Sequence, residues 1–266
     1  MKKKFNVNVY QSPKKDMISP FIVNNLRFVL FPYDNAVTSS IIEGWQYEFY
    51  MFDFLKKNYI ETIGTDIIDV GANNGNFAVD FAHLVGDEGR VFSFEPQRII
   101  FQQLCANVFI NGLDNVYTYN CAVGDTNKKV KLEKPDYHDK KTVNFGNVAI
   151  LDEVDSYEWV ETKRLDDFDF KNVSFIKIDV QGYEPFVIEG AKETISKHRP
   201  YLFVEFEDHM LIPNGSSDDL LKKQIEALGY EVKQFQDGIP YQTKSGKCLD
   251  CVCIPLEREP HNHIVP

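Results

Sequence analysis

The chain has 266 residues, of which 43% are hydrophobic and 26% are charged, and its formal net charge is −11. This size fits one large α/β domain with an ordinary core, or a domain with an extension. The negative charge weighs against broad, sequence-independent binding to nucleic acid, which needs a basic face. No apolar run reaches about 18 residues and no charged-then-apolar start is of the signal-peptide type. We therefore expect a soluble protein made in the cytoplasm.

The first 60 residues predict two elements. Residues 1–40 are polar and irregular, and within them residues 26–31 predict one strand of a small hairpin. The aromatic stretch 45–58 has helical spacing and predicts a helix that covers the mouth of the sheet. Glu48 opens this helix and is a candidate cofactor contact, while core packing is the better interpretation for most of the aromatic rings.

Residues 67–96 predict a strand, a glycine-rich turn, a helix and a second strand that ends in an acid. The β-branched run around Asp69 is typical of a buried parallel strand. Gly71 and Gly75 allow a tight turn and close approach of the backbone to a ligand. Glu95 follows Gly71 by 24 positions, at a strand end where an acid accepts hydrogen bonds from both hydroxyls of a ribose.

The turn indicates which nucleoside is bound. Residues 71–76 read Gly-Ala-Asn-Asn-Gly-Asn, without the middle glycine of the dinucleotide pattern and without Arg or Lys. A small uncharged turn directly after Asp69 suits a zwitterionic sulfonium ligand better than a diphosphate, which predicts S-adenosylmethionine. A nicotinamide-binding or ligand-free Rossmann turn is the alternative. The candidate cofactor contacts in this segment are Asp69, Gly71, Ala72, Asn73, Gly75, Asn76, Phe77, Glu95 and Pro96.

A helix over about residues 98–111 and a third strand over 116–120 come next. Ala122 and Val123 follow that strand, where a small apolar pair can lie against a flat adenine ring. The residues expected to face inward from the helix are Ile99, Leu104, Val108 and Phe109.

Residues 126–150 contain no obvious long element. Their lysine-rich part, 128–141, predicts a solvated surface insertion, with a local basic patch as the alternative. Residues 144–147 are a candidate loop that closes over the site. Residues 164–168 predict a turn that enters a short helix.

Residues 173–179 predict a strand that ends in Asp179, followed by a turn at Gly182 and one helix over 184–197. A fifth strand over 201–206 ends among acids. A further helix over 220–228 precedes two last strands, 230–235 and 249–254, which we expect to be antiparallel at that end of the sheet.

The polar residues at these strand ends should converge. Ligands bind outside the carboxyl ends of the strands in an open α/β sheet. We predict Asp179 as general base or acceptor-orienting group, with a structural or cofactor-side acid as the alternative, so Asp179 is also a candidate cofactor contact. Lys177 lies on the same strand face as Asp179. We expect Lys177 to be the ion-pair partner of Asp179 or to stabilise a developing alkoxide. Glu205 and His209 are second candidates, and Gln181 is a candidate cofactor contact.

We predict no metal. Asp179, Glu205 and Asp208 are the alternative, as a carboxylate cluster for a divalent ion. Cys248, Cys251 and Cys253 are suggestive of zinc, which His261 or His263 would complete, but zinc usually takes four ligands from paired motifs. Five cysteines without a secretory signal favour reduced thiols.

Many short motifs occur together in one order along about residues 40–255, and they resemble the FkbM family of S-adenosylmethionine-dependent methyltransferases. The motifs are Tyr47-Glu48, DVGANNGNF, GRVFSFEP, a helix with Asn107 and Asn111, AVGD, RLDD, FIKIDVQGYE, EGA, RPYLFVEFE and LGY. The resemblance implies a Rossmann-like class I sheet of seven strands, the last antiparallel, flanked by helices. It also implies O-methyl transfer, often onto sugars or polyketide-type hydroxyls. Gln181 and Tyr183 depart from the usual family pattern.

We therefore predict an amino-terminal extension (1–40), a methyltransferase domain (41–256) and a carboxyl-terminal tail (257–266). The predicted activity is methyl transfer to a hydroxyl of a sugar, a glycan or a small hydroxylated metabolite. The alternatives are RNA ribose or a protein as acceptor, a non-catalytic nucleoside-binding scaffold, and a nicotinamide-dependent oxidoreductase. The predicted partner is a small-molecule or glycan acceptor, with neither nucleic acid nor a membrane span, and a homo-oligomer is left open.

Overall fold

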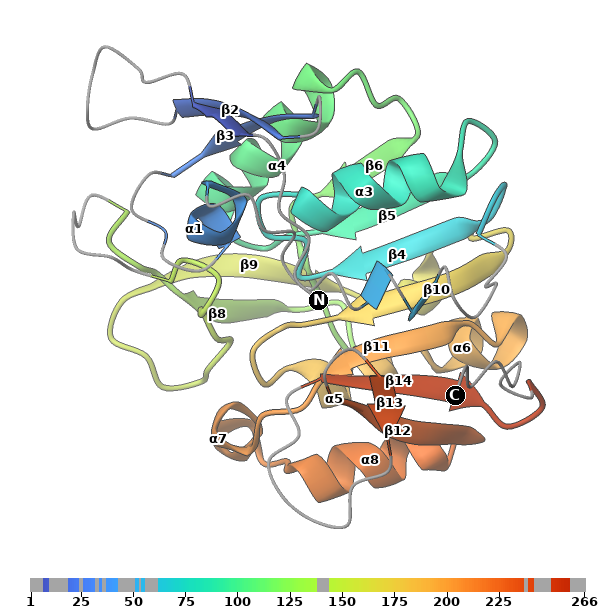
Figure 1. Cartoon of the computed structure of the whole chain (residues 1–266). Helices are drawn as coiled ribbons and strands as arrows, with labels where there is room; N and C mark the ends of the chain where they lie inside the picture. The colour runs from blue at the N-terminus through green and yellow to red at the C-terminus, as the bar shows by residue number, and fades with distance from the viewer. Residues whose placement is uncertain are drawn as a thin grey trace.

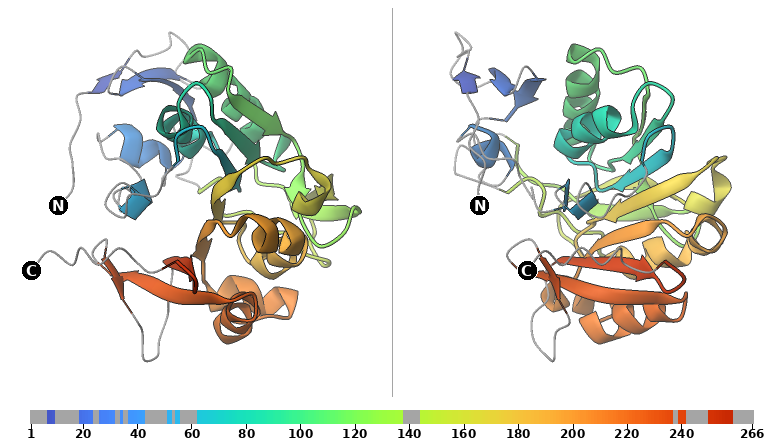
Figure 2. Two further views of the ribbon diagram at one scale, coloured as in Figure 1. Left: turned by 90° about the vertical axis from the view of Figure 1, so that its right-hand side faces the viewer. Right: turned by 45° about the vertical axis from the view of Figure 1, so that its right-hand side comes forward.

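The protein is an α/β structure built on one large sheet, seen here in a computed structural model (Figures 1 and 2). The structure describes residues 7–9, 19–23, 26–31, 34, 37–42, 51–52, 54–55, 62–137, 144–236, 239–241 and 250–258.

The central sheet has eight strands in the order β13-β12-β14-β11-β10-β4-β5-β6. The strands are β4 (Asp66–Val70), β5 (Arg90–Phe94), β6 (Val116–Tyr119), β10 (Val173–Ile178), β11 (Tyr201–Glu205), β12 (Tyr230–Gln236), β13 (Ile239–Tyr241) and β14 (Asp250–Pro255). The run from β11 to β6 is parallel, whereas β14 pairs antiparallel with both β11 and β12. The predicted seven-stranded sheet with an antiparallel last strand is confirmed, and the short β13 adds an eighth strand at the edge.

Alternating side chains divide the core into two layers because successive residues of a strand point to opposite faces. Ile67 and Phe175 face one hydrophobic cluster, which α3 (Asn76–Val85) covers. Ile68 and Ile176 face the other cluster, which contains side chains of α5 (Glu184–Glu189), α6 (Lys192–His198) and α8 (Asp218–Glu226). Strands β4 and β10 are buried throughout, as expected of parallel strands covered on both faces.

Helix α4 (Arg98–Ile110) corrects one prediction. It buries Ile100, Leu104 and Val108, a stripe at intervals of four residues, while Ile99 is only half-buried. Phe109 follows that stripe by one position, on the solvent side of the helix, and is 86% exposed. The expectation that Phe109 faces inward was therefore wrong.

The predicted single helix over 184–197 is two helices, α5 and α6, with Gly190 between them. A Cβ atom at Gly190 would lie only 1.9 Å from the carbonyl oxygen of Gly124. The break thus lets the chain pass close to the segment that follows β7 (Ala122–Val123).

A ribbon of two strands was not predicted. The strands β8 (Lys129–Glu133) and β9 (Tyr157–Lys163) pair antiparallel, and β9 also pairs with β7 to form a small separate sheet. The ribbon lies at the end of the large sheet to which the arrowheads of β4 and β10 point (Figure 1). The lysine-rich segment is therefore partly regular structure, while η1 (Leu165–Asp167) confirms the predicted short helix.

At the amino terminus, β2 (Ser19–Val23) and β3 (Leu26–Leu30) form the predicted hairpin, and β1 (Val7–Val9) adds a third strand. Helix α1 (Val37–Ile42) packs with β3 against α3. The division of the chain at residue 40 stays a prediction.

Of the predicted helix over 45–58, residues 51–52 and 54–55 are described and helical. Phe52 packs in the core against Phe77 and Phe81, at ring-centroid distances of 5.6 and 5.4 Å. Glu48 lies outside the described residues. The remaining elements are α7 (Asp208–Leu211) and η2 (Ile212–Asn214).

Candidate functional site

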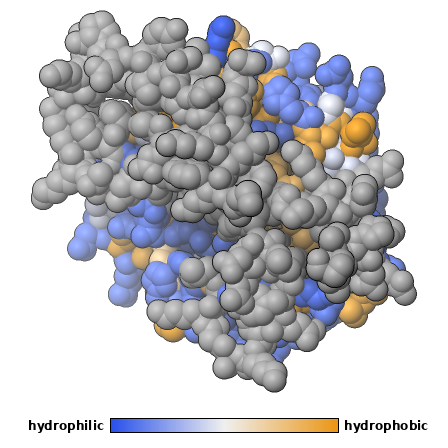
Figure 3. Space-filling view, viewed as in Figure 1, coloured by the Kyte–Doolittle hydropathy of each residue, from blue (hydrophilic) through white to orange (hydrophobic). Residues whose placement is uncertain are grey.

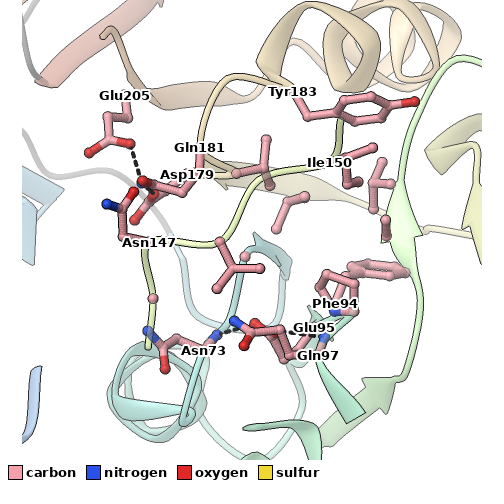
Figure 4. A pocket seen from close by; sticks show the side chains of 18 of the residues that line it. Asn73, Phe94, Glu95, Gln97, Asn147, Ile150, Asp179, Gln181, Tyr183 and Glu205 are labelled. Carbon is pink, nitrogen blue, oxygen red and sulfur yellow. Dashed lines mark hydrogen bonds between the residues drawn. The ribbon is translucent and has the colours of Figure 1, made fainter. Parts of the chain in front are cut away.

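A cavity of about 350 Å³ lies at the carboxyl ends of β4, β5, β10 and β11. This is where the strand order reverses, because β4 has the later strand β10 on one side and the next strand β5 on the other. Open α/β sheets bind ligands at such a switch point. Figure 4 shows the side chains that line the cavity.

The glycine turn forms the floor of the cavity. Gly71 has a φ of 80°, and a Cβ atom there would lie 1.8 Å from the carbonyl oxygen of Asp179. The turn can therefore pack against the end of β10 only with glycine at this position. Gly75, with a φ of 83°, packs in the same way against Leu104 of α4.

Glu95 lies at the end of β5 with a carboxylate that is almost fully buried. Its two oxygens accept backbone hydrogen bonds from Asn73, at 2.9 Å, and from Gln97, at 2.8 Å. Burial raises the pKa of this carboxyl to about 7, against the effect of these two hydrogen bonds. Figure 4 shows its carboxylate in the cavity wall between Asn73 and Phe94.

The cavity has one apolar end. Ala122, Val123 and Phe94 are among its lining residues, and the contact of Ala122 and Val123 with an adenine ring stays a prediction. Tyr183 and Ile150 close this end on the other side in Figure 4. The further apolar lining residues are Leu132, Val148 and Cys121.

The other end is polar and charged. The Lys177 ammonium lies 3.2 Å from Asp179 and 3.9 Å from Asp69, and Lys177 is 1% exposed. The predicted ion pair between Lys177 and Asp179 is confirmed. Among the described residues, neither carboxylate oxygen of Asp69 has a hydrogen-bond partner, and burial raises the pKa of Asp69 to about 6.

Through Gln181, Asp179 is also connected to Glu205, the last residue of β11. Gln181 donates to Asp179 at 3.2 Å and to Glu205 at 2.8 Å. His209 lies at the rim, where it is 72% exposed and 3.6 Å from Glu207. Lys177, Asp179, Glu205 and His209 thus all line the one cavity although they come from two different strand ends.

The predicted cofactor contacts fall into three groups. Three residues, Asp69, Ala72 and Gly75, are buried behind the cavity wall, where they shape the turn. Glu48 lies outside the described residues. The residues that line the cavity are Gly71, Asn73, Asn76, Phe77, Glu95, Pro96, Ala122, Val123, Asp179 and Gln181.

Sequence reasoning missed a group of residues beside Glu95. The Gln97 side chain donates to the backbone oxygen of Phe145 at 2.9 Å and accepts from the Tyr137 hydroxyl at 2.9 Å. These bonds hold the segment that begins at Asn144 against the cavity, which Asn144 and Asn147 line. The candidate loop 144–147 is therefore at the predicted place, but no local signal pointed to Gln97 or Tyr137.

Within the part of the chain that the structure describes, no three His, Cys, Asp or Glu side chains are grouped to hold a metal ion. Cys251 and Cys253 point into one core cluster from β14. Cys248, His261 and His263 lie outside the described residues.

The strand order, the glycine turn and the acid that ends β5 define a Rossmann-like α/β protein with a nucleoside-type site. A sequence profile described as the methyltransferase FkbM domain matches residues 69–232, which is more than half of the chain. The chain therefore belongs to the FkbM methyltransferase family, and the predicted resemblance and enzyme class are confirmed at the level of the family.

One curated relative is the 2-O-methyltransferase NoeI of Sinorhizobium fredii, which is 29% identical over 160 residues. The match covers 54% of this chain and 64% of NoeI, so the chain spans a little less than two thirds of that relative's length.

Two solved structures match this chain at low sequence identity. Methyltransferase FkbM from Methylobacillus flagellatus KT has a TM-score of 0.47 and 18% identity, and the match covers 71% of this chain and 43% of that one. A SAM-dependent O-methyltransferase from Thermotoga maritima has a TM-score of 0.45 and 13% identity, with coverage of 80% and 67%.

Among the described residues, no helix combines the length and apolar character that a membrane crossing needs. The described surface visible in Figure 3 mixes hydrophilic and hydrophobic residues.

Proposed function

We propose that this protein is an S-adenosylmethionine-dependent O-methyltransferase that methylates a hydroxyl of a sugar, a glycan or a small hydroxylated metabolite. The observation that carries the proposal is the buried Glu95 carboxylate, which lies in the cavity wall between an apolar end and a charged end. A nucleoside with an amino-acid tail has three parts that match the cavity in the same order: a flat base for the apolar end, a ribose with two hydroxyl donors for Glu95, and a charged tail for the charged end.

The residues of the cavity fit this cofactor. Phe94, Ala122 and Val123 would contact the adenine, and Glu95 would accept hydrogen bonds from the ribose hydroxyls. The turn from Gly71 to Asn76 would lie along the methionine part, where no lysine or arginine of the turn opposes the sulfonium. When bound, the cofactor supplies a methyl group already activated by positively charged sulfur.

The chain's own residues then have to hold the acceptor and remove its proton. Asp179 lies at the charged end of the cavity, with its carboxylate ion-paired to Lys177. We assign Asp179 as the base that takes the hydroxyl proton while the new bond forms. Lys177 keeps this carboxylate ionised and oriented, since burial alone would favour its neutral form.

The relative NoeI, whose name describes 2-O-methyl transfer, supports oxygen as the methylated atom. A hydroxylated acceptor is further supported by the rim of the cavity, where Gln181, Glu205 and Asn147 offer hydrogen-bonding groups. RNA ribose is the second candidate, but the net charge of −11 opposes the phosphate backbone.

Calorimetric titration with S-adenosylhomocysteine and, separately, with NAD tests the cofactor. We expect micromolar binding of S-adenosylhomocysteine and at least about tenfold weaker binding by Glu95→Ala, equivalent to roughly 1.4 kcal/mol. Glu88→Ala is the matched control, because Glu88 is an exposed acid on the loop before β5 and outside the cavity lining. It should bind like the wild type.

Tighter binding of NAD, or no binding of S-adenosylhomocysteine, would contradict the proposal. Glu95→Gln is included because Glu95 also accepts two backbone hydrogen bonds. Its thermal transition and that of Glu95→Ala report whether a loss of binding comes from loss of the fold. Asp179→Asn distinguishes an enzyme from a scaffold without turnover. In an enzyme, this variant should abolish methyl transfer to an acceptor found by screening hydroxylated compounds.

A further inference from the structure

Asp179, Gln181 and Glu205 form a continuous hydrogen-bonded group at the charged end of the cavity (Figure 4). Both bonds use the same atom, the Gln181 Nε2, which is 2.8 Å from Glu205 Oε2 and 3.2 Å from Asp179 Oδ1. An amide nitrogen has two hydrogens, so one can point to each carboxyl group. The carboxyl groups of Asp179 and Glu205 are called the carboxyl pair below.

The backbone holds Gln181 in a rarely adopted conformation. Its φ is 55°, which few residues other than glycine adopt. Gly182 follows with a φ of 94°, and a Cβ atom there would lie 2.0 Å from the carbonyl oxygen of Met210. The buried Glu184 carboxylate accepts from the backbone nitrogens of Val180 and Gly182, at 3.0 and 3.2 Å. The fold thus maintains a strained backbone at Gln181, as functional sites often do.

The charges around the carboxyl pair do not balance. The single ammonium of Lys177 faces Asp179 directly and is shared with Asp69. Four acids repel a negative charge on Glu205: Asp179, Glu184, Glu207 and Asp250. Among the residues that the structure describes, Lys177 is the cation paired with Asp179, and ionising both carboxylates in this partly buried place is costly because the two charges repel.

Two opposite shifts follow from this geometry. Burial, and then repulsion by Asp179, raise the pKa of Glu205 far above its ordinary value. Burial also acts to raise the pKa of Asp179, but Lys177 and the hydrogen bond from Gln181 outweigh it and lower the pKa. A single proton on the carboxyl pair is therefore favoured on Glu205 and not on Asp179.

We propose that Asp179 and Glu205 hold one proton between them, with Asp179 ionised and Glu205 neutral in the resting protein, and that Gln181 is the positioning residue that maintains this arrangement. This inference rests on the proposed function for its use. To the proposed function the inference adds a role for Glu205, which is the group through which the proton taken up by Asp179 leaves the site.

The proton balance of one turnover is then complete. As the oxygen–methyl bond forms, the acceptor O–H bond breaks and its proton binds Asp179, while the sulfur–methyl bond breaks and leaves its electron pair on sulfur. Glu205 releases its own proton to water at the rim, where Glu207 and the exposed His209 lie. The proton on Asp179 then moves to Glu205, which restores the resting state.

The test follows the carboxyl carbons by NMR in protein labelled with ¹³C at the side-chain carboxyls of Asp and Glu, from about pH 3 to about pH 12, so that the lowered midpoint of Asp179 and the raised midpoint of Glu205 both come into range. It uses neither cofactor nor acceptor, so its outcome does not depend on the methyltransferase activity. We expect the Glu205 signal at the neutral position and the Asp179 signal at the ionised position at pH 7. Glu205→Gln and Asp179→Asn assign the two signals by removing them.

The variants then test the coupling. Asp179→Asn should lower the titration midpoint of Glu205 by at least about one pH unit. Glu205→Gln, which resembles neutral glutamic acid, should leave the Asp179 signal ionised and unmoved. Gln181→Met should move the midpoints of both groups upward, because it removes a donor to each, whereas a merely structural role would change only thermal stability.

Glu207→Gln is the matched control, since Glu207 is a neighbouring acid outside the carboxyl pair. It should shift the titration midpoint of Glu205 by less than half of the shift caused by Asp179→Asn. The proposal is overturned if both groups are ionised at pH 7, or if the Glu205 midpoint is the same in Asp179→Asn. Should Asp179→Asn fail to fold, a shifted Asp179 signal in Glu205→Gln would overturn it equally.

Discussion

Glu95 links the architecture of the turn to its chemistry. Its carboxylate holds two backbone N–H groups, those of Asn73 and Gln97, and so fixes both sides of the cavity floor. Gln97 in turn bonds Tyr137 and the backbone of Phe145. A single buried acid thereby connects the glycine turn with the segment that begins at Asn144, and its protonation state should affect ligand binding.

We expect the affinity for S-adenosylhomocysteine to rise with pH between pH 6 and pH 8. The pKa of Glu95 is about 7 in the protein without ligand, and only the ionised carboxylate can accept from two ribose hydroxyls while it holds two backbone groups. A group with this pKa is mostly neutral at pH 6 and mostly ionised at pH 8, which makes binding roughly tenfold tighter at the higher pH. Calorimetry at constant ionic strength measures the change.

Glu95→Gln supplies the comparison for this pH dependence. Its amide does not titrate, so its binding should be weaker and nearly the same at the two pH values. A wild-type affinity that is constant, or that falls between pH 6 and pH 8, would show that Glu95 does not hold the ribose in its ionised form.

At the scale of elements, α4 joins the amino-terminal sheet to the site. Asn107 accepts from the backbone nitrogen of Val29 at 2.6 Å, and Gln103 donates to the Val29 oxygen at 2.7 Å. One turn further on, Asn111 makes both bonds to the backbone of Arg27. Side chains of α4 thus satisfy the open edge of β3 as another strand would.

Asn107 is fully buried, and it also donates to the backbone oxygen of Asn74 in the glycine turn, at 2.7 Å. We expect Asn107→Ala to lower the free energy of unfolding by about 1–3 kcal/mol, because it leaves buried backbone groups unpaired. Urea denaturation followed by circular dichroism measures this loss.

The matched control lies two residues further on the same helix. Phe109→Ala should change the free energy of unfolding by less than about 0.5 kcal/mol, since its side chain is 86% exposed. Equal losses in the two variants would contradict the assigned roles of α4's two faces.

These elements also explain which parts could be predicted from the sequence. The unit from β4 to Glu95 was predictable because its strand, turn, helix and acid are contiguous, and its glycines have a local conformational cause. The ribbon of β8 and β9 was missed since its strands are separated by more than 20 residues and pair only through tertiary structure. The contacts of Gln97 likewise join residues 40 and 48 positions apart, which no periodicity reveals.

At the scale of the whole molecule, the fold buries more acids than it neutralises. Asp69, Glu95 and Glu184 are buried, and burial raises their pKa values to about 6, 7 and 7. Glu95 lines the cavity, Asp69 lies behind the cavity wall, and Glu184 closes the turn that contains Gln181. The protein therefore keeps acidic groups in places that favour their neutral form.

This arrangement predicts that the protein without ligand loses stability as pH rises from 5.5 to 8. For an acid whose pKa is raised by folding, the folded state binds more protons than the unfolded state between the two pKa values, so stability falls with rising pH across that window. For Glu95, with an ordinary pKa of 4.5 and a folded pKa of about 7, the loss is about 2 kcal/mol. Urea denaturation at the two pH values measures it, and Glu95→Gln should remove that part of the slope.

His198 has the opposite effect on the pH dependence of stability, because burial lowers the pKa of its imidazole below 6.5, but this effect appears only toward the acid side of the window.

The stability of the protein without ligand should fall as pH rises, whereas the affinity for S-adenosylhomocysteine should increase, and together these two trends give a further prediction. Ionised Glu95 destabilises the empty site and strengthens the complex, so saturating S-adenosylhomocysteine should raise the unfolding free energy more at pH 8 than at pH 5.5. An equal or smaller stabilisation at pH 8 would separate the buried acids from ligand binding and leave them as structural groups alone.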